Sequence, residues 1–334
     1  MFKLLFRRGL IALCMILSAT ANADEPFYRD QLITYVVATK PGGGYDAYAR
    51  LIAPFLEKHL PGSRVVVRNV PGAGHIIGAN QVYAAKPDGL TLVTFNTGLI
   101  YAQLLEREGV RFDLARMGWI GKAAADPRVL LVSTAAPFHT VADLRRSARP
   151  IVLASSGAGT AAHNEMRILA EVLGFPVTLV PGYAGNEAEM AILRGEVEGM
   201  LGSWSSLRPF VERKQGRPLL RIGGDAVDFQ DIPEVGDLVT DADARSVVAF
   251  IRAQSELGRL TAVPPDVPAD RLATLRDAYA RALADPELHA QAAQLRLPLA
   301  PLDGESVAGM VRSALSPSPR ALARIRELAA GGND

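Results

Sequence analysis

Residues 32–62 read LITYVVATKPGGGYDAYARLIAPFLEKHLPG and contain a complete strand, loop and helix. The β-branched apolar run Leu32–Val37 predicts a buried strand. Apolar side chains then recur at helical spacing from Tyr45 to Leu60, which predicts an amphipathic helix ending at Pro61-Gly62. This order of elements is typical of βαβ units built around parallel strands.

The same alternation of strands and helices continues along the chain. Further strands are predicted at Arg64–Val70, Thr91–Phe95, Gly118–Ile120, Val129–Val132, Ile151–Ala154, Val177–Val180, Gly199–Leu201 and Leu219–Ile222. Further helices are predicted at Ala161–Leu173, Asn186–Arg194 and Ala269–Leu283, and another strand is expected after Ser246. We therefore predict an α/β protein of two lobes, each a mostly parallel sheet flanked by helices. Lobe 1 is expected to hold residues 24–125 and 248–334, and lobe 2 residues 126–247.

Length and charge narrow the class of protein. A chain of 334 residues is long enough for two lobes of ordinary domain size. Its 36 basic and 35 acidic residues nearly cancel, so no broad basic field attracts nucleic acid. The five histidines are scattered without metal-ligand spacing, and we predict neither a metal nor a cofactor.

The first 23 residues have the pattern of a secretory signal peptide. Lys3, Arg7 and Arg8 precede the apolar run Gly9–Leu17, and Ala21-Asn22-Ala23 supplies an A-x-A cleavage site. The run is shorter than the roughly 20 residues that span a bilayer, which argues against a membrane anchor. The only cysteine, Cys14, lies inside this segment. We expect cleavage after Ala23 and a periplasmic protein without cysteine, with the Sec and twin-arginine export routes both open.

Three glycine-rich loops follow strands and lead into helices: residues 41–46, 71–74 and 155–160. Helix N-termini at the carboxyl ends of parallel strands favour anions, because free N–H groups and the positive end of the helix dipole gather there. In the first loop, Asp46 is expected either to cap the helix or to meet a polar ligand group. A phosphate-binding P-loop is excluded because no Gly-Lys-Ser/Thr follows the glycines. The second loop matches the dinucleotide fingerprint only weakly.

The third loop also allows a hydrolase hypothesis. Ser156 would be the nucleophile and His163 its base, although the G-x-S-x-G elbow is missing and an orienting acid is still needed. A histidine that bonds locally on a helix face is the plainer interpretation of His163. Tyr183 and Trp204 follow strands at the same end of the second sheet, so either could form a pocket wall.

With these loops in order, the chain resembles the receptor subunits of tripartite tricarboxylate transporters, the Bug family of periplasmic binding proteins. The segments that carry the resemblance are Pro41–Asp46 with Ala49-Arg50, Asn69–Gly74 with Gly78-Ala79, Pro87–Gly89, Ala154–Thr160 with His163, and Arg194–Val197. The resemblance implies a two-lobed periplasmic binding protein fold of type II and a ligand carboxylate held between the first and third loops. It implies no enzymatic activity.

The resemblance also implies a set of ligand-binding residues. They are Gly43, Gly44, Tyr45 and Asp46 from one lobe and Ser156, Gly157, Gly159 and Thr160 from the other, with Asn96, Thr97, Tyr183 and Ser203 as further candidates. The ligand would be a di- or tricarboxylate or an aromatic acid, delivered to the membrane subunits of the transporter. The chain departs from the family pattern at Tyr45, where threonine or serine is common. An alternative is a ligand-sensing partner of a membrane signalling protein. We expect a monomer, because closure of two lobes needs free surfaces.

Overall fold

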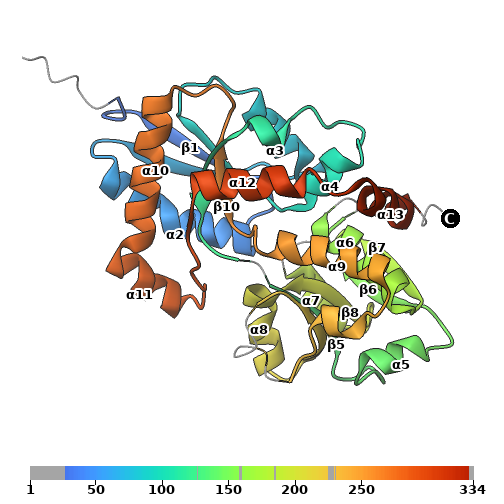
Figure 1. Cartoon of the computed structure of the whole chain (residues 1–334). Coiled ribbons are helices and arrows are strands. Elements are labelled where there is room, and N and C mark those ends of the chain that lie inside the picture. Colours follow the sequence, from blue (N-terminus) through green and yellow to red (C-terminus); the bar gives the residue numbers. More distant parts are fainter. Residues whose placement is uncertain are drawn as a thin grey trace, which may run out of the picture.

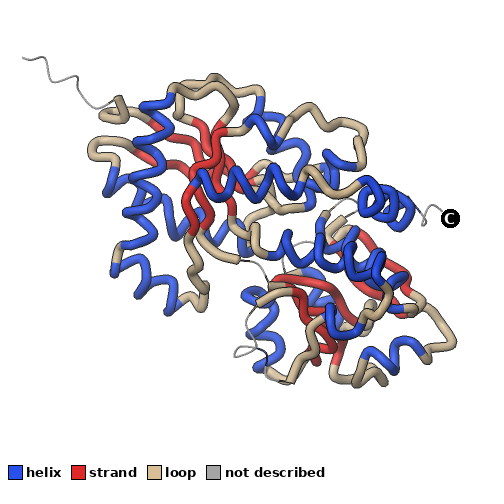
Figure 2. The backbone as a smooth tube through the Cα atoms, in the orientation of Figure 1, coloured by secondary structure: helices blue, strands red, loops and turns tan. Residues whose placement is uncertain are grey.

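The computed structural model describes residues 27–125, 127–157, 160–183, 186–224, 229 and 231–330. The predicted signal peptide and the predicted site residue Gly159 lie outside these residues. Figures 1 and 2 show two groups of strands, each flanked by helices. Within the described residues, no helix combines the length and apolar character needed to cross a membrane.

The first lobe is built on a six-stranded sheet with the order β11-β4-β10-β3-β1-β2. Its strands are β1 (Leu32–Val37), β2 (Arg64–Asn69), β3 (Thr91–Thr94), β4 (Gly118–Lys122), β10 (Leu260–Val263) and β11 (Leu302–Asp303). Strand β1 pairs in parallel with β2 and β3, whereas β10 runs antiparallel to both β3 and β4. The C-terminal part of the chain therefore returns to the first sheet.

The second lobe is built on a five-stranded sheet with the order β7-β6-β8-β5-β9. Its strands are β5 (Arg128–Ser133), β6 (Ile151–Ser155), β7 (Val177–Pro181), β8 (Gly199–Ser203) and β9 (Gly216–Ile222). Strand β6 is parallel to β7 and β8, and β5 is antiparallel to β8 and β9. Each sheet is thus mixed. The chain enters the second lobe on β5 and returns to the first on β10, and each of these strands runs antiparallel to both of its neighbours.

The predicted helices form close to their predicted bounds. The helices of the described chain are α2 (Gly44–His59), α3 (Ile76–Tyr83), α4 (Gly98–Leu104), α5 (Val141–Arg145), α6 (Ala161–Leu173), α7 (Glu187–Leu193), α8 (Trp204–Glu212), α9 (Ala242–Ser255), α10 (Ala269–Ala284), α11 (Pro286–Gln294), α12 (Gly304–Ala314) and α13 (Pro319–Ala330). Among them, α6 is capped at its start by the Thr160 side chain and ends at Gly174 in the left-handed conformation.

Both faces of each sheet are buried, which explains the nearly continuous apolar runs of the strands. Because side chains alternate along a strand, Tyr35 and Val37 of β1 enter the core that contains α2 and α10, whereas Val36 enters the core that contains α3, α4 and α12. Strand β5 divides in the same way, with Leu130 on the α6 and α9 side and Leu131 on the α7 and α8 side. The sheets are therefore rigid platforms for the loops at their edges.

The stretch after Ser246, where we expected a strand, is part of helix α9. Val247, Val248 and Ile251 are buried on one helical face, and Asp241 caps the helix by accepting a hydrogen bond from the Ala244 N–H at 2.8 Å. The spacing of these three residues and the aspartate cap are helix signals that outweigh the β-branched composition.

The predicted lobe boundaries stay a prediction. The packing of the helices near the C-terminus differs from the predicted division in two places. Position 248 falls inside α9, whose apolar face packs into the core of the second lobe. Helix α13, which we assigned to lobe 1, packs against α6 and α9, and Figure 1 shows it beside them. The last helix therefore covers the second lobe after the chain has completed the first sheet.

Candidate functional site

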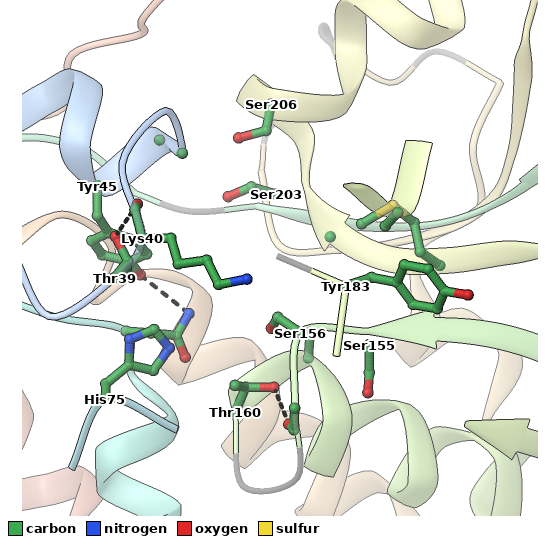
Figure 3. A pocket seen from close by; sticks show the side chains of 18 of the residues that line it. Thr39, Lys40, Tyr45, His75, Ser155, Ser156, Thr160, Tyr183, Ser203 and Ser206 are labelled. Atoms are coloured by element: carbon green, nitrogen blue, oxygen red, sulfur yellow. Dashed lines mark hydrogen bonds between the residues drawn. The ribbon is translucent and has the colours of Figure 1, made fainter. Parts of the chain in front are cut away.

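A cleft of about 780 Å³ lies between the two lobes. The first lobe contributes residues 38–40, 42–45, 71–75 and Asn96 to its lining, and the second contributes residues 154–157, Thr160, Tyr183 and residues around 200–207. All three predicted glycine-rich loops therefore meet at one place. Figure 3 shows the labelled side chains of Tyr45 and His75 on one side of the cleft and those of Ser156 and Tyr183 on the other.

The first-lobe loop presents the start of α2 to this cleft. Gly43 precedes the first helical residue, and no side chain caps the helix there. A Cβ atom on Gly43 would have no heavy atom within 4 Å, so the space in front of the loop is open. A Cβ atom on Gly44 would lie 2.8 Å from Nη2 of Arg259. Uncapped N–H groups beside open space are suited to an anionic ligand.

Asp46, predicted as a ligand residue or a cap, does not line the cleft, and its carboxylate supports the loop from behind. It accepts hydrogen bonds at 3.0 Å from the Gly42 N–H, from Arg50 and from Asn69. Burial by itself would raise the pKa of Asp46, but these hydrogen bonds outweigh it and hold the pKa below its ordinary value. Asp46 therefore stays ionised and fixes the glycine loop.

Tyr45 and Arg259 form the wall beside the loop. The guanidinium carbon of Arg259 lies 4.4 Å from the centre of the Tyr45 ring, in a cation–π contact. The Tyr45 hydroxyl accepts a hydrogen bond from Asn96 Nδ2 at 3.4 Å. Tyr45, the residue that departs from the family pattern, is thus held on both sides and shapes the cleft.

Asn96 and Thr97 lie at the contact between the lobes. Asn96 lines the cleft, and its Oδ1 accepts hydrogen bonds from the N–H of Gly98 at 2.8 Å and from that of Ala161, in the other lobe, at 3.1 Å. Thr97 is fully buried and is not part of the lining. Its hydroxyl accepts a hydrogen bond from Arg128 Nη2 at 2.8 Å. Thr97 therefore positions Arg128, which does line the cleft.

The second-lobe loop combines exposed and fixed groups. Ser156 is exposed to the cleft, and Gly157 has a φ of +144°, which favours glycine. The Thr160 hydroxyl donates a hydrogen bond to the Gly157 carbonyl at 2.9 Å and accepts one from the His163 N–H at 3.4 Å. Thr160 thereby locks the loop onto the start of α6, while Ser156 stays available to a ligand.

His163 contacts Ser155, whereas the hydrolase hypothesis requires the next residue, Ser156, as its nucleophile. Its Nδ1 lies 3.0 Å from Ser155 Oγ. Burial and the charges of Arg167 and Arg107 lower the pKa of His163, so the ring is neutral at pH 7. This local pairing fits the plainer interpretation of a helix-face histidine. Among the described residues, no three His, Cys, Asp or Glu side chains gather as a metal site would require.

Tyr183 and Ser203 complete the predicted set, and both line the cleft. The Tyr183 hydroxyl donates a hydrogen bond to Glu196 at 3.3 Å, and Ser203 Oγ accepts one from Arg259 Nη2 at 2.9 Å. Sequence reasoning missed Arg259 itself, which precedes β10 and is far from every motif.

Other lining residues were also missed, among them Lys40, His75 and Glu189. Lys40 and His75 adjoin the first two glycine-rich loops, and that adjacency is a signal that could have identified them. Glu189 lies near the start of α7, and its side chain is largely buried.

Comparison with known sequences gives a consistent result. A model of the family described as the tripartite tricarboxylate transporter family receptor matches residues 48–297. The UPF0065 protein in the tcbD-tcbE intergenic region of Pseudomonas sp. (strain P51) is 30% identical over 252 residues, which cover 72% of this chain and 71% of that protein.

Comparison with solved structures agrees. The periplasmic binding protein BugD superposes with a TM-score of 0.75 at 21% identity, covering 90% of this chain and 98% of BugD. MatC from Rhodopseudomonas palustris, solved with bound malate, gives a TM-score of 0.70 at 20% identity and covers 90% of this chain and 99% of MatC. These similarities show the two-lobed binding protein fold.

Proposed function

Because the chain belongs to the tripartite tricarboxylate transporter receptor family, we propose that it captures a small carboxylate between its lobes and delivers it to the membrane subunits of such a transporter. The protein would bind its ligand without changing it. The proposed ligand class is a di- or tricarboxylate or an aromatic acid.

The observation that carries the proposal is the pairing of two loops across one cleft. The start of α2 lies on one side and the loop that leads into α6 lies on the other. The donors offered there are backbone N–H groups and the Ser156 hydroxyl, which suit a carboxylate. A ligand that bonds to both loops stabilises the closed arrangement of the lobes.

The relatives support the ligand class and the location. Proteins of this family are receptors of a transporter, and MatC holds malate, a dicarboxylate. We extend both properties to this chain: a periplasmic protein, exported by a signal peptide that is removed after Ala23. We also propose that the receptor acts as a monomer, which light scattering at several concentrations would test.

The test is thermal denaturation of the mature protein, residues 24–334, with a panel of dicarboxylates, tricarboxylates, aromatic acids and amino acids. A ligand at a hundred times its Kd stabilises the native state by about 2.7 kcal/mol, which raises Tm by several degrees. We expect such shifts with carboxylates. If no carboxylate in the panel raises Tm, the proposed function is wrong.

A matched pair of variants locates the binding site. In Gly43→Leu, the new side chain extends into the open space of the cleft without meeting protein atoms at Cβ. Gly309→Leu makes the same change in α12, where a Cβ atom also meets nothing within 4 Å. We expect Gly43→Leu to abolish the ligand-induced shift, and Gly309→Leu to keep it. A catalytic role for Ser156 would appear as ester hydrolysis that Ser156→Ala removes, and we expect none.

A further inference from the structure

Lys40 extends into the ligand cleft from the first-lobe loop. It lies two residues before Gly42, and it lines both the main cleft and a second cavity of about 810 Å³ at the cleft mouth. Figure 3 shows its side chain reaching from the Tyr45 side toward Ser156 and Tyr183 of the other lobe. A cationic side chain therefore crosses the space in which the ligand is proposed to bind.

The partner of Lys40 across the cleft is a weak one. Its Nζ lies 3.5 Å from Oε2 of Glu187, at the start of α7, and the two side chains are 53% and 54% exposed. Exposed ion pairs contribute little to stability because water and salt screen them. Lys40 can therefore exchange this partner for an anionic group of a ligand at little cost.

The other cations of the two cavities are more firmly held. Arg259 is buried and donates hydrogen bonds to Ser203 and Ser205. Arg128 is also buried and donates a hydrogen bond to Thr97. Arg194 lines the mouth cavity, but its Nε and Nη2 atoms bond to Glu196. Lys40 is the cation whose position and weak pairing suit exchange with a ligand.

We propose that Lys40 is a specificity-determining residue that binds a second anionic group of the ligand, which makes the ligand a dicarboxylate. This inference rests on the proposed function. One carboxylate occupies the two loops, and the other points to the cleft mouth, where the Lys40 ammonium leaves Glu187 and donates hydrogen bonds to it. Once Lys40 has left it, the Glu187 carboxylate lies near a negatively charged ligand, and the repulsion between the two slightly opposes binding. The ammonium thus selects against acids with a single carboxylate.

The experiment compares dicarboxylates with monocarboxylates of equal chain length by calorimetric titration of the mature protein. The probes are succinate, glutarate and adipate against butyrate, valerate and hexanoate. We expect wild type to bind at least one dicarboxylate about tenfold or more tightly than its matched monocarboxylate, as the loss of a charge-assisted hydrogen bond predicts. Lys40→Met keeps the length of the side chain and removes its charge, and it is expected to abolish that preference because it weakens the binding of dicarboxylates much more than that of monocarboxylates.

Two further variants test the mechanism. Lys86→Met makes the same charge change on an exposed turn outside the cleft and is expected to bind like wild type. Glu187→Gln removes the competing partner and is expected to raise dicarboxylate affinity a fewfold. Because the competition is electrostatic, added salt should reduce the effect of Lys40→Met.

The outcomes separate this inference from the proposed function. If mono- and dicarboxylates bind equally, or if Lys40→Met keeps the preference, the role of Lys40 is wrong and the carboxylate receptor stands. If amino acids bind more tightly than either series and Glu187→Gln weakens them, Glu187 recognises a ligand ammonium and the inference is overturned. If no carboxylate binds, both proposals fail.

Discussion

The Nη2 atom of Arg259 lies 2.9 Å from the Oγ atom of Ser203, so a side chain of the first lobe donates a hydrogen bond to the second lobe. A second bond, to Ser205 Oγ at 3.2 Å, leaves the same nitrogen. The guanidinium also contacts the Tyr45 ring and lies against Gly44. One buried cation thus connects the glycine loop to the opposite wall of the cleft.

Replacement of Arg259 by methionine is expected to lower the free energy of unfolding by about 1–3 kcal/mol, because the interlobe hydrogen bonds and the cation–π contact are lost. Urea denaturation measures the change. Arg208→Met is the control, since Arg208 is half exposed and pairs with Glu212 one helical turn away; a change within about 0.5 kcal/mol is expected there. Equal effects of the two substitutions would mean that Arg259 is not a structural bridge.

A glycine at the start of α4 sets how closely the lobes approach. A Cβ atom on Gly98 would lie 2.5 Å from the backbone nitrogen of Ala161 and 3.0 Å from the carbonyl carbon of Thr160. Backbone atoms at a capped helix start cannot yield easily, so Gly98→Ala is expected to push α4 away from α6 and destabilise the protein by about 1–3 kcal/mol.

Gly309→Ala is the matched control for that substitution, because it also replaces a helical glycine but meets nothing within 4 Å. The control is expected to gain about 0.5–1 kcal/mol from helix propensity. Thermal denaturation of both variants measures the difference. A stabilised Gly98→Ala protein would contradict the close contact between the lobes.

A buried ion pair supports the same region. Arg128 and Glu165, 2% and 0% exposed at their side chains, form a salt bridge, and Arg128 also donates to Thr97 of the first lobe. Glu165→Gln is expected to cost about 3–5 kcal/mol, since it leaves a buried guanidinium without its counter-charge.

The double variant Arg128→Met with Glu165→Leu tests whether that loss comes from the pair. It removes both charges, and we expect it to recover a large part of the stability, as buried pairs replaced by apolar residues commonly do. Denaturant unfolding of Arg128→Met, of Glu165→Leu and of the double variant forms the cycle. Strictly additive losses would show that the two charges do not depend on each other.

The sequence predicts the strands and the framework of the site well, for a physical reason. Strands buried on both faces need continuous apolar runs such as Leu32–Val37, and strand-to-helix turns need glycines, so both features are local in the sequence. The three glycine-rich loops were found by that logic, and residues of all three line one cleft.

The residues that sequence reasoning missed owe their roles to contacts between distant segments. Arg259 reaches the site because β10 inserts between β3 and β4, a pairing that no local pattern encodes. Asp46 and Thr97 were predicted on the correct segments, but neither side chain lines the cleft. The direction of the Asp46 side chain depends on its position around helix α2, and that of Thr97 depends on its contact with Arg128. The helix α9 was missed because its β-branched residues outweighed its aspartate cap in our interpretation.

Acid is expected to weaken the protein through His75, which lines the cleft. Its Nδ1 lies 2.8 Å from the Ala38 carbonyl, and burial lowers the pKa of the ring below its ordinary value of 6.5. Below pH 6.5 the unfolded chain therefore binds a proton at His75 more readily than the folded chain does. The free energy of unfolding consequently decreases as the pH falls below 6.5. His163, whose pKa is also lowered, contributes with the same sign.

The pH dependence of urea denaturation between pH 7 and 5.5 tests this expectation. Each histidine with a lowered pKa contributes a slope of up to about 1.4 kcal/mol per pH unit. His75→Gln is expected to flatten the wild-type slope by part of that amount, whatever its effect on stability at pH 7. If His75→Gln keeps the full slope, the ring of His75 does not resist protonation in the folded protein, and the acid sensitivity has another origin.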